Sequence, residues 1–269
     1  MQEHSPKTVQ SFDRAVAILD AFTAERSALG VSQIARITGL SRSTVHRLLV
    51  TLRQHELVQQ LPASTDYALG PHVLRLAEVA FSHVTLQKTA RATMPALRDQ
   101  CDETVGLHTR LHPTARTVLD QFQSSQPLRR IYTEIGVPIP IHQGAPGKVL
   151  LAYSSSELQD EVLSGELEAA TPRTITDPVK LRTELARTRK NGYALSLEER
   201  IAGTSTLAVP LANHTGTVIA ALSVTGPSSR LSRKHLLELI PRAAAAAHAI
   251  SEALGYAGKK FQNNSKPRT

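Results

Sequence analysis

The sequence has little of several features that mark particular classes of protein. It contains one cysteine, Cys101, which excludes an intramolecular disulfide and favours a reducing compartment. No apolar run approaches the roughly 18 residues that a membrane-spanning helix requires. The opening stretch MQEHSPKTVQ has no charged segment followed by an apolar one, so we expect no secretory signal. We therefore expect a cytoplasmic protein with no membrane partner.

Positive charge exceeds negative charge, but it is unevenly distributed. The 269 residues carry a net charge of +8, and this length suits two domains with separate cores. The first 70 residues contain seven basic and six acidic side chains, whereas four basic residues follow Tyr256. Any basic surface for nucleic acid in the first 70 residues is therefore local and does not cover the whole domain.

Residues 31–54 have the pattern of two helices joined by a tight turn. Gly39 and Leu40 form the expected turn, and Ser41 stands where a helix N-cap is expected. Apolar residues in the second helix follow the spacing i, i+3, i+4, i+7, which puts one apolar stripe along its back. These residues are Val45, Leu48, Leu49 and Leu52. The pattern is typical of a helix-turn-helix, although a plain helical hairpin with a solvated face shares it.

The front of the second helix suits DNA, because it is basic and rich in hydroxyl groups. Hydroxyls and helix N-terminal amides bind phosphates, and an arginine can pair with guanine in the major groove. Residues 56–70 predict a β-hairpin, which would complete a winged helix-turn-helix. Ser32 is the expected cap of the first helix. We expect double-stranded operator DNA as the partner, with contacts from Arg42, Ser43, Thr44, Arg47, Ser32 and Ser41.

The rest of the chain predicts a mixed α+β protein. Helices are expected over 12–23 (capped by Ser11), 72–86 as a linker, 86–97, 145–153, 155–164, 177–190 and 232–254. Strands are expected at 104–110, 117–123, 205–211 and 218–224, and residues 29–31 could pair as a short strand. These strands suggest an antiparallel sheet flanked by helices. The expected domains are 10–71, 72–86 and 87–255, with disordered segments 1–9 and 256–269.

Six sequence segments, taken together in their order along the chain, resemble the motifs of a known family. They are SFDRAVAILDAF, LSRSTVHRLLVTL, YALG, PIHQGAPGKVLLA, NGYALSLEERIAG and AALSVTGPSSRLS. Together they resemble the IclR family of bacterial transcription regulators over residues 10–255. The resemblance implies a winged helix-turn-helix domain, a linker helix used in dimerisation, and a GAF-like C-terminal domain that binds a small molecule. It also implies a homodimer, or a tetramer built as a dimer of dimers.

Two pairs of hydroxyl residues are spaced to share one side of a strand. Ser223 and Thr225 form one pair, and Thr204 and Thr206 form the other. Their spacing alone fits ordinary sheet residues as well as ligand contacts. The resemblance implies effector contacts at Leu128, Ile139, Ala145, Pro146, Ser196, Thr204, Thr206, Ser223 and Thr225. A site of hydroxyls, apolar walls and helix amides would hold a small organic acid such as a carboxylate.

The sequence gives weaker support to a nucleotide-binding loop, a metal site or an acid–base catalytic site. The stretch GAPGKV lacks the first glycine of a phosphate loop and has Val149 where Ser or Thr is needed. His108 and His112 have metal-like spacing only in a helix, and Glu198 and Glu199 would point opposite ways in an extended chain. We therefore expect no cofactor, metal or catalytic residue. One alternative is an enzyme of small organic acids whose N-terminal helices serve association. Another is a signalling module acting through protein contacts, which leaves the basic helix unexplained.

Overall fold

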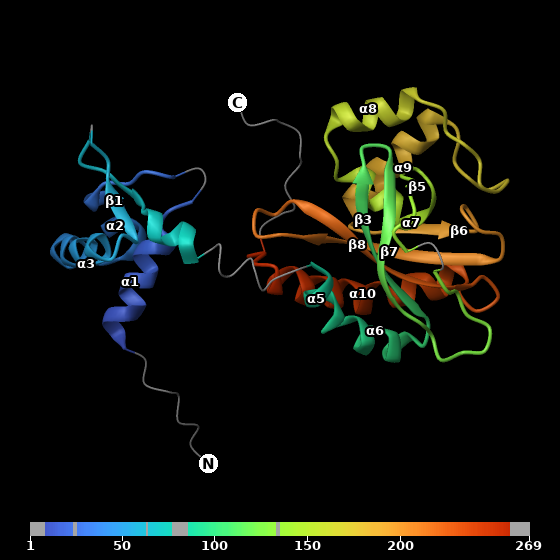
Figure 1. Ribbon diagram of the computed structural model, residues 1–269, viewed down its shortest axis with the longest axis horizontal. Coiled ribbons are helices and arrows are strands. Elements are labelled where there is room, and N and C mark those ends of the chain that lie inside the picture. Colours follow the sequence, from blue (N-terminus) through green and yellow to red (C-terminus); the bar gives the residue numbers. More distant parts are fainter. Residues whose placement is uncertain (1–8, 24–25, 63, 77–85, 133–134, 259–269) are drawn as a thin grey trace, which may run out of the picture. The chain divides into compact units, whose positions relative to one another are not determined.

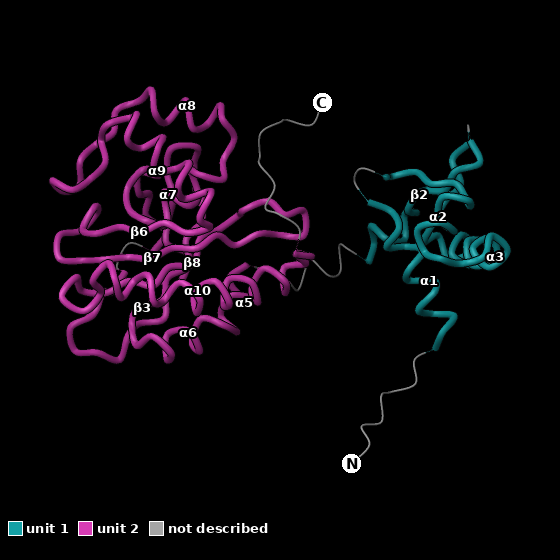
Figure 2. Tube along the Cα trace, turned by 180° about the vertical axis from the view of Figure 1, so that it is seen from behind, with its two compact units in different colours: residues 1–83 teal, residues 84–269 magenta. Residues whose placement is uncertain are grey.

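The computed structural model describes residues 9–23, 26–62, 64–76, 86–132 and 135–258. The chain divides into two compact units, residues 1–83 and 84–269, which Figure 2 shows in different colours. Each unit is described by itself. Residues 1–8 of the expected disordered segment 1–9, residues 77–85 of the expected linker helix 72–86 and residues 259–269 of the expected disordered tail 256–269 lie outside the described residues. Residues 71–76 are helical.

The first unit contains three helices followed by a two-stranded antiparallel hairpin. Its elements are α1 (Gln10–Asp20), α2 (Val31–Thr38), α3 (Arg42–Gln54), β1 (Val58–Gln60) and β2 (Tyr67–Leu69). Leu29 pairs with Tyr67, so the connection before α2 does add a short strand-like bridge to the hairpin. The core draws on all these elements, with Ile18, Ile34 and Leu49 wholly buried. The winged helix-turn-helix pattern predicted from the sequence is therefore confirmed.

The caps of these helices were only partly predicted. The Ser41 side chain accepts a hydrogen bond from the backbone N–H of Thr44 and caps α3 as expected. Ser32 does not cap α2: the N-cap is Gly30, whose N–H donates to the Gln33 side chain at 2.8 Å. Ser11 likewise lies inside α1 and does not cap it, because the helix begins one residue earlier. A serine one or two residues past a helix start cannot act as its N-cap.

The second unit is a six-stranded antiparallel sheet between two layers of helices (Figure 1). Its strands are β3 (Thr104–His112), β4 (Ala115–Phe122), β5 (Ile139–Pro140), β6 (Ala194–Leu197), β7 (Thr204–Ala212) and β8 (Val218–Pro227). Its helices are α5 (Leu86–Arg91), α6 (Met94–Cys101), α7 (Gly144–Ala152), α8 (Ser156–Ser164), α9 (Pro178–Asn191) and α10 (Arg233–Ala253). The strand order is β5-β4-β3-β8-β7-β6.

The two faces of the sheet have separate cores. One face packs against α5, α6 and α10 through side chains such as Leu107 and Leu222. The other packs against α7, α8 and α9 through smaller residues such as Ala208 and Ala221. Because successive strand residues face opposite sides, polar residues next to Leu107 and Leu222 lie on the α7 side. The expected α+β class, with an antiparallel sheet flanked by helices, is confirmed.

Two features of this unit differ from the sequence predictions, namely one helix and two short strands. The helix expected over 86–97 is two helices, because Pro95 has no N–H and its ring would clash with the carbonyl of Arg91 in a continuous helix. Pro95 instead lies in the first turn of α6, where the missing N–H costs nothing. The short strands β5 and β6 were not predicted. Within the described residues, no helix has the length and apolar character to cross a membrane.

Candidate functional site

Helix α3 separates a buried back from an exposed front. Val45, Leu49 and Leu52 are buried in the core of the first unit. Arg42, Ser43 and Arg47 are exposed, and Thr44 is partly exposed. The apolar stripe therefore faces inward as predicted, and the basic, hydroxyl-bearing face of the helix is available to a partner.

Three hydroxyl side chains gather at the N-terminus of α3. The Ser41 Oγ lies 2.9 Å from Ser43 Oγ, 2.9 Å from Thr44 Oγ1 and 3.2 Å from the Thr44 backbone N. The positive end of the helix dipole and these hydroxyls together suit a phosphate oxygen. Ser32 is exposed on α2, within the same unit.

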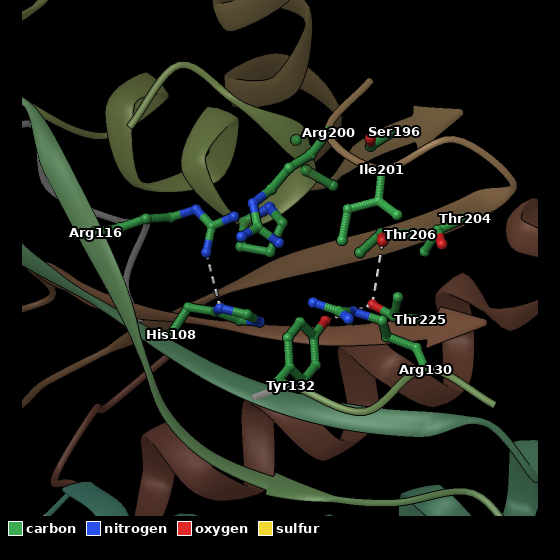
Figure 3. Close-up of a pocket in the computed structure, with 13 residues that line it drawn as sticks. His108, Arg116, Arg130, Tyr132, Ser196, Arg200, Ile201, Thr204, Thr206 and Thr225 are labelled. Atoms are coloured by element: carbon green, nitrogen blue, oxygen red, sulfur yellow. Dashed lines mark hydrogen bonds between the residues drawn. The ribbon is translucent and has the colours of Figure 1, made fainter. Parts of the chain in front are cut away.

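The second unit contains a small polar cavity on the α7 side of the sheet (Figure 3). Its volume is about 30 Å³, which is room for about two water molecules. The residues that line it are His108, Arg116, Arg130, Tyr132, Gly144, Ala145, Pro146, Ser196, Arg200, Ile201, Thr204, Thr206 and Thr225. They come from β3, β4, β6, β7, β8, the start of α7 and two loops, so tertiary folding assembles the cavity.

A row of hydroxyl groups crosses four strands beneath this cavity. Ser196 on β6 is paired with Thr206 on β7, Thr206 with Thr225 on β8, and Thr225 with Thr104 on β3. Thr225 donates to Thr206 at 3.1 Å. Thr104 donates to the backbone carbonyl of Arg130 at 2.5 Å. The row thus provides polar groups for the cavity floor and holds the loop that carries Arg130.

His108 lies under one end of the cavity and is completely buried. A guanidinium N–H of Arg116 donates to its Nδ1 at 3.1 Å, so we assign the ring proton to Nε2, which donates to Ser223 Oγ at 2.8 Å. Burial, with the nearby charges of Arg116 and Arg200, lowers the pKa of His108 well below its usual value. His108 is therefore a neutral positioning group here. Within the described residues, no cluster of three His, Cys, Asp or Glu could hold a metal ion.

Tyr132 closes the cavity from the side of the β3–β4 hairpin. Its hydroxyl lies 2.7 Å from Thr225 Oγ1 and 3.3 Å from Ser223 Oγ. The ring fits because residue 106 is glycine: a Cβ there would lie 2.8 Å from the Tyr132 ring. The Gln121 side chain accepts a hydrogen bond from the Tyr132 N–H and donates one to the Tyr132 carbonyl, both at 2.8 Å.

Three arginines give the cavity wall its charge. Arg116 is buried, whereas Arg130 and Arg200 are partly exposed. The open side of Gly144, at the start of α7, faces both Arg116 and Arg200. The first amides of α7 have no acceptor within the helix, so they add partial positive charge at the same place. The cavity wall thus combines three arginine side chains with the N-terminus of α7.

A buried ion pair fixes the position of the loop that carries Arg200. Lys148 on α7 is wholly buried, and its Nζ lies 2.6 Å from Glu199 Oε1, 3.3 Å from Glu184 Oε1 and 2.6 Å from the Leu195 carbonyl. Burial raises the pKa of the Glu199 carboxyl, and the Lys148 charge acts in the opposite direction. This lysine, which resembles that of a phosphate loop in sequence, is thus enclosed by protein groups.

The expected effector positions are mostly brought together. Six of them line the cavity: Ala145, Pro146, Ser196, Thr204, Thr206 and Thr225. Ser223 lies directly behind the wall, and Ile139 packs under Tyr132. Leu128 is not in the wall. Its side chain is 65% exposed, and its carbonyl accepts a bond from Arg230 instead.

The sequence did not point to the charged part of the wall. The residues missed are His108 (considered only as a metal ligand), Arg116, Arg130, Tyr132, Gly144, Arg200 and Ile201. The strand that carries Arg116 also contains Thr117, Asp120 and Gln121, so the burial of this arginine was not evident from the sequence.

Comparison with known proteins matches the two units to domain models of the same family. The model of the IclR helix-turn-helix domain matches residues 11–62, and that of the bacterial transcriptional regulator IclR C-terminal domain matches residues 79–252. The chain belongs to the IclR family. The HTH-type transcriptional regulator XynR of Escherichia coli K12 is 33% identical over 250 residues, covering 92% of this chain and 98% of XynR.

Solved structures of the family agree with the fold. An IclR-type protein from Silicibacter sp. TM1040 superposes with a TM-score of 0.83 at 29% identity, covering 96% of this chain and 99% of that protein. An IclR homologue from Microbacterium hydrocarbonoxydans, complexed with 4-hydroxybenzoate, has a TM-score of 0.57 at 26% identity, covering 91% and 98%. The chain is thus a ligand-responsive, DNA-binding transcription regulator, and the alternative of an enzyme is not supported.

Proposed function

We propose that this regulator binds operator DNA through the exposed front of α3 and changes its DNA affinity when a small organic acid occupies the cavity. The observation that supports the DNA contact most strongly is the division of α3 into a buried apolar back and an exposed basic front. The proposed contacts are Arg42, Ser43, Thr44, Arg47, Ser32 and Ser41. Hydroxyls and helix amides hold phosphates, and Arg47 pairs with a base edge.

The protein works as a homodimer or a tetramer in the cytoplasm. A dimer places two α3 helices in successive major grooves, so its operator has two half-sites about one helical turn apart. Light scattering coupled to size exclusion distinguishes a dimer from a tetramer. A monomer at the concentrations used for DNA binding would contradict this part of the proposal.

The effector is a carboxylate held in the second unit. The cavity combines arginines, hydroxyls and the N-terminus of α7, which together suit a carboxylate. The bound 4-hydroxybenzoate of the Microbacterium homologue supports an acid as the ligand class. The proposed contacts include Ala145, Pro146, Ser196, Thr204, Thr206 and Thr225, with Ser223 and Ile139 behind them. The effect on DNA affinity is of the usual size for such coupling, about 1–3 kcal/mol.

The test of the DNA contact is a gel shift with DNA that flanks the gene. Arg47→Ala is expected to weaken specific binding by about 5- to 150-fold, which corresponds to the loss of one arginine–guanine pair. Binding to unrelated DNA changes much less. Arg182→Ala, at an exposed arginine of α9, removes the same charge from the second unit and serves as the control. Equal affinity of the Arg47→Ala and wild-type proteins for the operator would contradict the assignment.

A further inference from the structure

The first unit contains a polar cleft between α1 and α3, which we call the α1–α3 cleft. Its volume is about 190 Å³, several times the roughly 30 Å³ that one water molecule occupies in the liquid. The residues that line it are Ser11, Arg14, Thr44, Arg47, Leu48 and Thr51. Ser11 and Arg14 belong to α1 and the others to α3, so the cleft depends on the packing of these two helices.

Helical spacing directs the lining side chains into the cleft. Ser11, Arg14 and Ile18 follow the spacing i, i+3, i+7, so they share one side of α1. Ile18 is wholly buried in the core that α1 shares with α3, and this fixes the direction of the Arg14 side chain. The lining residues of α3 likewise share one side of their helix, between its buried back and its exposed front.

The cleft has hydrogen-bond donors that no described protein group uses. Among the described residues, the side chains of Ser11, Arg14 and Arg47 form no hydrogen bond or ion pair. Thr51 differs, because its hydroxyl donates to the Arg47 carbonyl at 3.3 Å. Guanidinium groups stay protonated at physiological pH, and the described lining residues include two of them and no acidic side chain. The cleft therefore offers positive charge and a hydroxyl group to an anion from outside the unit.

The cleft lies at one edge of the proposed DNA-binding face. A helix in the major groove has a phosphate strand on each side of it. With the front of α3 towards the base edges, the side of α3 next to α1 faces one of these strands. Phosphate oxygens accept charge-assisted hydrogen bonds from arginine and further bonds from hydroxyl groups, which are the donors of the cleft.

We propose that the α1–α3 cleft binds a backbone phosphate of the operator and that Arg14 is the side chain that holds it. Ser11 adds a hydroxyl donor from the first turn of α1. Arg14 is half-buried beside α3, whereas Arg47 is exposed on the front of α3 and extends to a base edge. Arg14 thus contributes affinity for any DNA sequence, and Arg47 contributes the preference for the operator. This proposal rests on the proposed function, in which α3 binds DNA.

The test is a titration of labelled DNA with the full-length protein, followed by fluorescence anisotropy. The two DNAs are the sequence that flanks the gene and a shuffled sequence of the same length, each at several salt concentrations. Loss of one phosphate contact lowers the slope of log affinity against log salt by about 0.9, which corresponds to roughly 8-fold in affinity between about 1 M and about 0.1 M salt. Arg14→Gln is therefore expected to weaken binding of both DNAs equally, by roughly 5- to 10-fold for each bound protomer at about 0.1 M salt.

Further variants separate a phosphate contact from other effects. Arg14→Lys keeps the charge and is expected to restore most of the salt slope. Arg47→Ala is expected to lower affinity for the operator much more than affinity for the shuffled DNA. The control is Arg26→Gln, which removes the same charge from an exposed position of the first unit outside the cleft and is expected to leave both affinities nearly unchanged.

Thermal unfolding followed by circular dichroism shows whether Arg14→Gln is folded. We expect an unchanged midpoint, because the Arg14 guanidinium bonds to no other described group. If this variant does not fold, Arg14→Met, which keeps the apolar stem of the side chain, replaces it and is held to the same expectations.

Three results would overturn the proposal. The first is wild-type affinity of the folded Arg14 variant for both DNAs. The second is a loss confined to the operator with an unchanged salt slope, which assigns Arg14 to a base. The third is an equal loss in Arg26→Gln, which assigns the effect to the charge of the whole unit. With operator binding by the wild-type protein intact, each contradicts the phosphate contact alone, whereas a wild-type protein with no preference for the flanking DNA contradicts the proposed function as well.

Discussion

The ion pair between Lys148 and Glu199 should decide how the stability of the second unit depends on pH. Lys148 is wholly buried and Glu199 is largely buried, so neither charge is well solvated. Removing one partner of such a pair leaves the other as an uncompensated buried charge, which costs about 3–5 kcal/mol. We therefore expect Lys148→Met to lower the free energy of unfolding by about this amount near pH 8.

The sign of the pH effect follows from the pKa of Glu199. Burial raises this pKa in the folded protein, and Lys148 partly counteracts the rise. An acid with a raised folded pKa binds more protons in the folded than in the unfolded state, so stability falls as the pH increases from the unfolded towards the folded pKa. Without Lys148 the folded pKa rises further. The penalty of Lys148→Met should therefore shrink on acidification, because Glu199 becomes protonated.

The measurement is urea unfolding of the full-length protein at about pH 5 and about pH 8, since acidification moves a buried carboxyl with a raised pKa towards its protonated form. The chain has no tryptophan, so far-UV circular dichroism is the suitable signal. Lys180→Met replaces an exposed lysine of α9 and should stay within about 0.5 kcal/mol of wild type. A Lys148→Met penalty that is absent, or that grows at low pH, would refute the reasoning. Lys148→Met/Glu199→Gln should recover much of the loss.

Two further predictions concern a helix cap and a buried ring. Ser41→Ala should destabilise the first unit by about 0.5–2 kcal/mol, because it removes the N-cap of α3. The control Ser32→Ala removes no cap and should cost less than about 0.5 kcal/mol. Equal losses of stability in thermal unfolding would contradict this prediction. His108 should be neutral and protonated on Nε2 at about pH 6, because its pKa is lowered, and its contribution to stability should be lost as the pH falls below about 6.5. Nitrogen-15 NMR of the ring tests this, and a doubly protonated ring at that pH would contradict it.

The sequence predicted those helices and strands whose pattern lies within one short stretch of the chain. Helix α3 has a cap, an apolar stripe and a polar face within 14 residues, and each is visible in the sequence. The strands β3, β4, β7 and β8 were expected because each is long enough to show its pattern. Strand β6 has four residues and β5 has two, so neither has a periodicity to detect. Helix α2 shows a limit of cap prediction, since Gly30 and Ser32 are both acceptable caps by residue type.

The charged wall of the cavity could not be predicted by the same means. Arg116 comes from β4, Arg130 from the loop that follows it, and Arg200 from the loop between β6 and β7. No spacing in the chain relates these three positions, because their proximity depends on the strand order and on the packing of α7. The resemblance to a family supplied most of the hydroxyl and small residues of the wall. It included Leu128, which this chain leaves exposed.

The cavity and helix α5 are both bonded to strand β4. Gln121 of β4 holds both ends of the Tyr132 backbone, while its neighbour Asp120 binds Arg91 of α5 through two hydrogen bonds, the longer of which is 3.0 Å. Because adjacent residues of a strand face opposite sides, β4 connects the α7 face of the sheet to the α5 face. A ligand that displaces the Tyr132 ring acts on a backbone segment bonded to this strand. The contacts that form the cavity wall and those that anchor α5 are therefore part of one continuous set of hydrogen bonds.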